Sequence, residues 1–344
     1  MSGDDAAREA DELAGVALPE QNLGPVLGHF SVRARLDELV AAGRYPSAIL
    51  LSGPRGIGKA TLAFALARRI IAETGDESPQ RVDEQVVAGA HPNLTVLRRQ
   101  PRDARGFYTV IRVDEVRELR ESLHRTRGRD AWRVAIVDAV DDCNPSAANA
   151  LLKTLEEPPL QTMFILVSHR PGVLLPTIRS RCLGMAMRPL ADDEVSEVLS
   201  GQRPDQDVGH AVALAQGRPR RGFEALALGA EGALTDLKEW LNAPARKPGG
   251  AGLAIADALV SEADGGETGF ARELITNWLA GEARAAALEG IAGRGRLASA
   301  NALWDKAQAL FADEESLNLD ARQTLVAIFD AIRQHVSATA PEPR

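Results

Sequence analysis

Residues 49–61 read Ile49-Leu50-Leu51-Ser52-Gly53-Pro54-Arg55-Gly56-Ile57-Gly58-Lys59-Ala60-Thr61, an apolar run and a glycine-rich turn, and the helical pattern of residues 62–71 follows. In such a turn, successive backbone N–H groups converge on an anion at a helix N-terminus, and a lysine amine reaches the outer phosphates. The stretch therefore predicts a phosphate-binding loop. The alternative is a glycine-rich turn in another parallel α/β sheet. The predicted nucleotide-binding positions in this stretch are Gly53, Gly56, Gly58, Lys59, Ala60 and Thr61.

The position after Lys59 departs from a complete loop of this kind. A Ser or Thr there supplies the hydroxyl that coordinates the magnesium ion bridging the nucleotide phosphates, and this chain has Ala60. Thr61 carries a hydroxyl one residue later, but one helical residue is ~100° of rotation, so we expect it to point away from the metal. The sequence thus predicts weak or absent binding of ATP or ADP.

Length and composition indicate several helix-rich domains. The chain has 344 residues, 4% aromatic residues, 26% charged residues and a formal net charge of −8. An acidic balance argues against a free-standing, sequence-nonspecific DNA-binding protein, which is usually basic. It does not exclude DNA contact inside a larger assembly.

The cysteine count and the N-terminal residues bear on the compartment. Cys143 and Cys182 alone provide neither a disulfide framework nor a four-ligand zinc site, so we expect a reducing compartment and no zinc. Residues 1–22 are rich in Asp, Glu and Ala and lack both a basic start and a long apolar run. We interpret them as a loose acidic tail rather than a signal peptide or membrane anchor, and we expect a cytoplasmic protein with no membrane partner.

A second apolar run, residues 132–138, ends in Asp138 and is typical of a buried parallel strand. In nucleotide-driven motors this Asp supports the magnesium ion, and a Glu directly after it polarises the attacking water. Here the next residue is Ala139, whose methyl group accepts no proton. Asp141 and Asp142 lie too far along the chain to replace this base unless the register shifts. With Ala60, two catalytic positions are vacant, which favours an ATPase that has lost hydrolysis.

Residues 163–168 form another apolar run that ends in Ser168. Polar residues at strand ends of an open α/β sheet point into the ligand crevice, so Ser168 is a candidate phosphate sensor. Capping of the following turn is an equally good interpretation of Ser168.

Residues 174–182 carry Arg179 and Arg181 near the end of a short predicted helix. Basic residues there can simply favour the helix dipole. The alternative is an arginine finger, a guanidinium that reaches into the nucleotide site of a neighbouring subunit and stabilises the transferring phosphate.

Three segments together carry a resemblance to a known family: residues 53–59, residues 147–159 (AANALLKTLEEPP) and the triplet Ser180-Arg181-Cys182. They resemble the clamp-loader branch of the AAA+ superfamily, in the bacterial DNA polymerase III holoenzyme. The likeness covers roughly residues 23–228, with a weaker similarity at residues 317–323.

The resemblance implies an α/β fold, an AAA+ P-loop parallel sheet domain with a small helical lid and a C-terminal all-helical collar. The implied boundaries are residues 23–189 for the P-loop domain, 190–230 for the lid and 231–337 for the collar, with a tail over 338–344. We expect Trp240, Trp278 and Trp304 to be core residues of the collar.

The resemblance also implies a function. It indicates a non-hydrolysing stator in a pentameric ring with motor (gamma/tau) subunits and a delta subunit, which helps load a sliding clamp on primed DNA. In the family the arginine of Ser-Arg-Cys acts in trans, a role that falls on Arg181, and Arg220 best matches a second nucleotide sensor. A zinc module of some relatives is absent. Two alternatives stay open: an active ATPase motor subunit that uses Asp141 or Asp142, and an AAA+ adaptor outside replication.

Overall fold

The computed structural model describes residues 16–100, 108–125, 132–228, 232–244, 250–261, 266–317 and 319–339. The chain divides into two compact units, residues 1–227 and 228–344, which are described separately below. Residues 1–15 and 340–344 of the expected tails, and residues 245–249 within the expected collar, lie outside the described part.

The first unit is built on a five-stranded sheet in which every pairing is parallel. The spatial order is β2-β3-β4-β1-β5. The strands are β1 (Ala48–Ser52), β2 (Leu94–Arg98), β3 (Arg133–Asp138), β4 (Thr162–Ser168) and β5 (Leu183–Ala186). Because the strands are parallel, Ser52, Asp138 and Ser168 all finish at one edge of the sheet.

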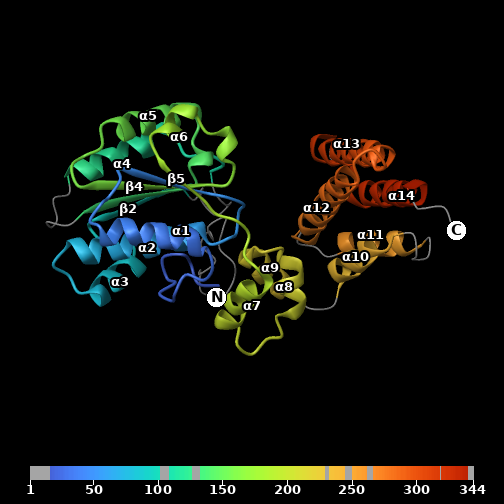
Figure 1. The fold of residues 1–344 in the computed structure, drawn as a ribbon, viewed down its shortest axis with the longest axis horizontal. Helices are drawn as coiled ribbons and strands as arrows, with labels where there is room; N and C mark the ends of the chain where they lie inside the picture. Colours follow the sequence, from blue (N-terminus) through green and yellow to red (C-terminus); the bar gives the residue numbers. More distant parts are fainter. Residues whose placement is uncertain are drawn as a thin grey trace, which may run out of the picture. The chain divides into compact units, whose positions relative to one another are not determined.

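Helices cover both faces of this sheet (Figure 1). One side carries α1 (Phe30–Ala41), α2 (Lys59–Thr74) and α3 (Pro79–Val87), and the other carries α4 (Val113–Arg125), α5 (Pro145–Glu156) and α6 (Pro176–Ser180). Alternate residues of each strand pack into opposite cores: Ile49 and Leu51 face α2, whereas Ala48 and Leu50 face α5. Burial on both faces explains why the strands are continuous apolar runs.

Helix starts follow local sequence signals at two places. The side chain of Asn144 accepts a hydrogen bond from the backbone N–H of Ala147 at 2.8 Å, and Pro145 occupies the first turn of α5. Ser78 caps α3 in the same way. Helix α1 differs, because it begins at Phe30 after His29 without a side-chain cap.

A three-helix segment completes the first unit: α7 (Asp192–Gln202), α8 (Gly209–Ala215) and α9 (Pro219–Leu228). It corresponds to most of the expected lid. The backbone N–H of Leu190 donates to the carbonyl of Gly217 at 2.8 Å, which ties the chain entering α7 to the turn before α9. Gly217 has φ of +74°, and a Cβ there would lie 2.5 Å from the carbonyl oxygen of Leu190, so only glycine fits this turn.

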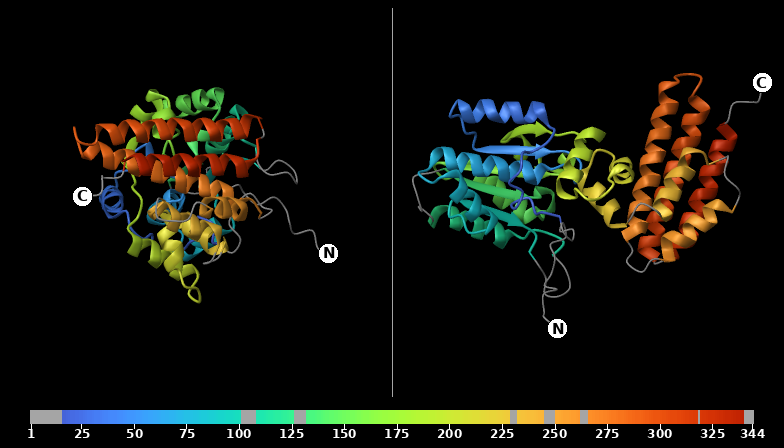
Figure 2. Two further views of the ribbon diagram at one scale, coloured as in Figure 1. Left: turned by 90° about the vertical axis from the view of Figure 1, so that its right-hand side faces the viewer. Right: turned by 90° about the horizontal axis from the view of Figure 1, so that it is seen from below.

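The second unit is all helical, as Figure 2 shows. It contains α10 (Ala233–Asn242), α11 (Ala251–Ser261), α12 (Gly266–Leu288), α13 (Arg294–Leu317) and α14 (Ala321–Thr339). Trp240 is fully buried, with its ring centroid 4.9 Å from that of Phe329. Of the three tryptophans expected in this core, Trp278 and Trp304 are only half-buried.

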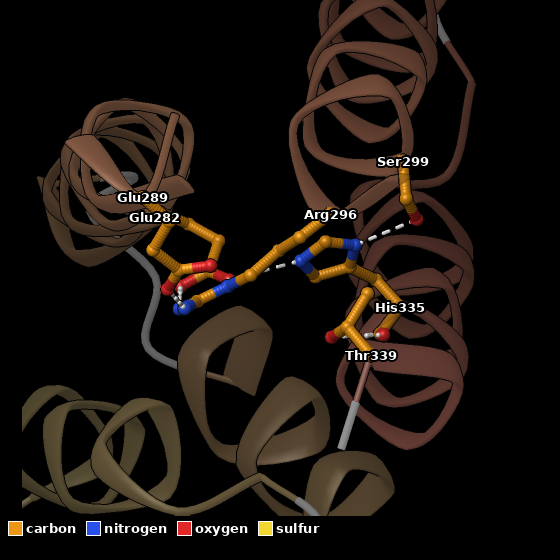
Figure 3. A network of polar contacts seen from close by, with 6 residues as sticks. All are labelled: Glu282, Glu289, Arg296, Ser299, His335 and Thr339. Carbon is orange, nitrogen blue, oxygen red and sulfur yellow. Dashed lines mark hydrogen bonds and ion pairs between the residues drawn. The ribbon is translucent and has the colours of Figure 1, made fainter. Parts of the chain in front are cut away.

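A polar network links the three long helices of this unit (Figure 3). The guanidinium of Arg296 (α13) donates to both carboxylate oxygens of Glu282 (α12), at 2.6 and 2.9 Å. The buried imidazole of His335 (α14) lies 3.2 Å from Glu282 Oε1 and 2.7 Å from the hydroxyl of Ser299 (α13). The hydrogen bonds from Arg296 are the main cause that lowers the pKa of Glu282. These bonds fix the mutual register of α12, α13 and α14.

The parallel sheet with helices on both faces, the helical segment after it and the helical second unit confirm the predicted fold class. Within the described residues, no helix combines the length and the apolar character that crossing a membrane requires.

Candidate functional site

The predicted phosphate-binding loop connects the end of β1 to the start of α2. Gly53, Gly56 and Gly58 have φ of +153°, +83° and +93°, which favour glycine. A Cβ on Gly53 would lie 2.3 Å from the carbonyl oxygen of Met187, and one on Gly56 would lie 2.9 Å from Cβ of Arg220. Helix α2 begins without a side-chain cap, so its first N–H groups are not satisfied by a side chain.

Lys59 is the buried cation of the loop. It is 3% exposed, and its amine donates to the carbonyl oxygens of Gly53 and Pro54 at 2.7 and 2.5 Å. Burial, the largest cause, together with the charge of Arg55, lowers the pKa of Lys59 to about 8, while Asp138 and Asp141 act in the opposite direction. The amine thus closes the loop on itself and must exchange these bonds to meet a phosphate.

A cavity of about 590 Å³ opens beside the loop, a size typical of small-molecule sites. The loop, the strand ends, residues 16–29 and the lid helices line it. One part of its lining is apolar and includes Leu18, Val26, Val198 and Phe223. Its charged lining comprises five basic residues and three acidic ones: Arg55, Lys59, Arg98, Arg99, Arg220, Asp138, Asp142 and Glu197.

Basic side chains crowd one another in this cavity. Burial, and then the nearby charges of Arg220 and Arg99, lower the pKa of Arg55. His169 adds no charge at neutral pH, because burial and the charge of Lys59 lower its pKa to about 4. The chain as a whole is acidic, so a locally basic cavity indicates an anionic ligand.

The cavity fits phosphates better than it fits magnesium. Ala60 and Thr61 both line it, although we expected Thr61 to turn away. Ala60 offers only a methyl group, and Ala139, which replaces the general base, is 3% exposed. Asp138 is the remaining carboxylate at the predicted metal position, and Mg²⁺ requires a near-octahedral set of oxygen ligands. The glycine loop and Lys59 suit phosphate, whereas the expected metal ligands are incomplete.

Asp141 is held by the end of β4. It lies in a short 3₁₀ helix, Val140–Asp142, and accepts hydrogen bonds from the Ser168 hydroxyl at 2.8 Å, from the backbone N–H of His169 and from that of Arg170 at 3.4 Å. Ser168 is 0% exposed and is not among the residues lining the cavity. The turn after β4 is thus capped by Asp141, and the Ser168 hydroxyl donates to that same carboxylate. These contacts occupy the carboxylate that could have replaced the base.

Asp142 does line the cavity, where it forms an ion pair with Arg99 at 3.1 Å. Burial raises the pKa of Asp142, and Arg99 opposes that shift. Asp142 is therefore the better placed of the two substitute bases, although its carboxylate is already engaged by a guanidinium.

The Ser180-Arg181-Cys182 triplet lies at the end of α6 and does not contribute to the cavity. Ser180 and Arg181 are exposed, and the Arg181 guanidinium pairs with Glu156 at 2.7 Å and donates to the carbonyl of Thr177 at 3.1 Å. Cys182 is half-buried, and burial raises the pKa of its thiol to about 11. The guanidinium is accessible at the surface of the unit.

Arg220 lies at the start of α9, where the lid meets the loop. Its backbone N–H donates to the carbonyl of Gly56 at 3.2 Å, and its guanidinium pairs with Glu224 at 2.9 Å. The structure thus brings seven predicted nucleotide-binding residues together around one cavity: Gly56, Gly58, Lys59, Ala60, Thr61, Asp138 and Arg220. Gly53 does not line the cavity; it packs against the backbone of Met187.

Sequence reasoning missed the role of residues 16–22, which we assigned to a loose tail. Arg68 of α2 donates to the carbonyl oxygens of Glu20 and Asn22, at 3.3 and 2.7 Å, and Glu20 pairs with Arg98 at 3.2 Å. These contacts hold the segment against the cavity. No cluster of three or more potential metal ligands occurs among the side chains that the structure describes.

Comparison with known proteins identifies relatives for this part of the chain. Residues 29–191 match the family model described as "DNA polymerase III, delta subunit". DNA polymerase III subunit delta' of Pseudomonas aeruginosa is 36% identical over 195 residues, 54% of this chain and 58% of that protein. Subunit delta' of Escherichia coli is 37% identical over 44% of this chain and 46% of that protein. Subunit tau of E. coli is 28% identical over 71% of this chain and 34% of that protein.

The aligned regions thus span about a third to just under two thirds of these relatives. Solved structures include the Thermotoga maritima RuvB Holliday junction branch migration motor, which is 16% identical with a TM-score of 0.44 over 92% of this chain and 90% of that chain.

Proposed function

Residues 29–191 match the DNA polymerase III delta-subunit model, and about half of the chain aligns with subunit delta' of two bacteria, so we propose that this chain is a delta'-type clamp-loader subunit. In this proposal it does not hydrolyse ATP. It serves as a stator beside a motor subunit and lends that subunit an arginine finger.

The state of the hydrolytic positions carries the proposal. Ala60 replaces the metal-binding hydroxyl and Ala139 replaces the general base. Both acidic substitutes are engaged, Asp141 by three donors at the end of β4 and Asp142 by Arg99. Each of the two carboxylates that could replace the base is therefore already engaged by other groups of the chain.

The position of Arg181 supports the finger role. Its side chain is 37% exposed and its partner Glu156 is 41% exposed. An exposed ion pair contributes only about 0.2–1 kcal/mol, so moving the guanidinium to a phosphate of an adjoining subunit costs little. A guanidinium fork suits that task because it stays charged and binds phosphate oxygens in two places.

The proposed partners follow from the relatives. They are the motor (gamma/tau) subunits and a delta subunit in a pentameric ring, together with the sliding clamp and, through the assembly, primed DNA. The helical second unit would supply the collar contacts of that ring.

The test is reconstitution of the clamp loader of the same organism with this chain carrying Arg181→Ala. The matched control is Arg179→Ala, which removes an exposed arginine of the same helix. We expect the Arg181 variant to assemble normally and to lose the DNA-stimulated ATP hydrolysis contributed by the neighbouring site, by about 10³-fold. An unchanged total rate for Arg181→Ala, or an equal loss for Arg179→Ala, would contradict the finger role.

A further inference from the structure

The cavity beside the predicted phosphate-binding loop lacks the expected magnesium-coordinating hydroxyl, and four arginines line it: Arg55, Arg98, Arg99 and Arg220. Ala60 takes the place of the coordinating hydroxyl. Arg55 lies in the loop itself, Arg99 follows β2, and Arg220 opens α9, so three separate elements send a guanidinium-bearing residue to one cavity.

Ion pairs offset only part of the positive charge at this cavity: Arg99 pairs with Asp142 at 3.1 Å and Arg220 with Glu224 at 2.9 Å. The charges of Arg220 and Arg99 add to burial in lowering the pKa of Arg55, and the charge of Arg55 adds to burial in lowering that of Lys59. Three carboxylates line the cavity against five basic residues. A polyphosphate would relieve this repulsion in a partly enclosed space, where charges interact strongly.

The rest of the site is suited to the phosphates of a nucleotide. The loop glycines adopt positive φ, and the N-terminus of the 16-residue helix α2 faces the loop without a side-chain cap. The buried amine of Lys59 lies against the same loop. The apolar lining by Leu18, Val26 and Phe223 offers a surface for a nucleoside.

We propose that this cavity binds a nucleoside di- or triphosphate without a divalent cation, and that Arg55, together with Arg99 and Arg220, supplies the positive charge that magnesium supplies in complete sites. The nucleotide is then a structural ligand that joins the lid to the P-loop domain. This inference rests on the P-loop core of the proposed function and not on the finger role of Arg181.

The test is titration of the full-length chain with ADP, followed by calorimetry, once with excess Mg²⁺ and once with EDTA. We expect saturable binding whose Kd differs by less than about twofold between the two conditions. Arg55→Gln should weaken binding about tenfold in both conditions, the loss of one charge-assisted hydrogen bond. Arg44→Gln, at an exposed position outside the cavity, is the matched control and should bind as the unmodified chain does.

A gain-of-function variant tests the metal directly. Ala60→Thr restores a hydroxyl at the coordinating position, so Mg²⁺ should now tighten ADP binding by about tenfold. Binding by the unmodified chain only in the presence of Mg²⁺ would overturn the proposal, as would no saturable binding at millimolar ADP in either condition. Because neither outcome involves Arg181, failure here is distinguishable from failure of the finger role.

Discussion

The hydrogen bonds of Asp141 allow a quantitative test of why this chain lacks a general base. If the carboxylate is a structural acceptor, Asp141→Ala leaves the fully buried Ser168 hydroxyl and the backbone N–H of His169 without their partner. Each buried unsatisfied donor costs about 1–3 kcal/mol. The third donor, the N–H of Arg170, belongs to an exposed residue and can turn to water.

We therefore expect Asp141→Ala to lower the free energy of unfolding of the first unit by about 2–4 kcal/mol. Asp141→Asn keeps one acceptor oxygen and should cost about half of that. The matched control is Asp114→Asn, which removes an exposed ion pair with Arg117 and should cost no more than about 0.5 kcal/mol.

The assay is urea unfolding of the full chain by circular dichroism, with hydrogen–deuterium exchange of the β4 peptide to locate the loss. Exchange should accelerate in β4 of the Asp141 variants and stay unchanged in α12 to α14. Equal stability of Asp141→Ala and the unmodified chain would refute the structural role. Loss of an ATP turnover that the unmodified chain possesses would also refute it, because Asp141 would then act as the base.

Four further outcomes follow from the contacts described above. Gly53→Ala places a Cβ 2.3 Å from the carbonyl oxygen of Met187, so thermal unfolding should show that the free energy of unfolding falls by about 2 kcal/mol or more. The free-chain pKa of Lys59 is about 8, and a bound phosphate raises it, so ADP affinity should fall as pH rises through 8 and lose this dependence in Lys59→Ala. Glu156→Gln releases Arg181, the proposed arginine finger, so hydrolysis by the reconstituted ring should stay unchanged or rise by up to about fivefold, and a loss would contradict this. His335→Ala removes the imidazole that contacts both Ser299 and Glu282 in Figure 3, and it should destabilise the second unit alone by about 1–3 kcal/mol. Hydrogen exchange should become faster in α12 to α14 and stay unchanged in β4.

The sheet and the loop could be predicted because they depend on local patterns. Continuous apolar runs over residues 132–138 and 163–168 mark strands buried on both faces. The glycines and Lys59 are adjacent in the sequence, so the loop geometry needs no long-range information. The start of α5 likewise depends on adjacent residues, the N-cap Asn144 and Pro145 in the first turn.

Long-range contacts are what the sequence did not reveal. Helix α3 buries only Val82 and Val86, too few apolar positions to stand out in a polar segment. Arg68 looks like a surface residue of α2, yet it is 8% exposed because it binds the backbone of residues 20–22, 46 to 48 positions away. The Asp141–Ser168 bond joins the ends of two strands in the same way.

The convergence of arginines was also invisible before the fold was known. Arg55, Arg99 and Arg220 come from widely separated parts of the sequence, and only the parallel sheet and the lid bring them to one cavity. Of these three arginines, only Arg220 has a role implied by the family resemblance, that of a second nucleotide sensor.

The central claim is that this chain keeps the frame of a nucleotide-driven motor without the chemistry to hydrolyse ATP. Its most direct test is the release of labelled phosphate from ATP by the isolated full-length chain with Mg²⁺, beside Lys59→Ala and Asp142→Asn. The account predicts the same background rate for all three proteins. Turnover by the unmodified chain that disappears in either variant would contradict it.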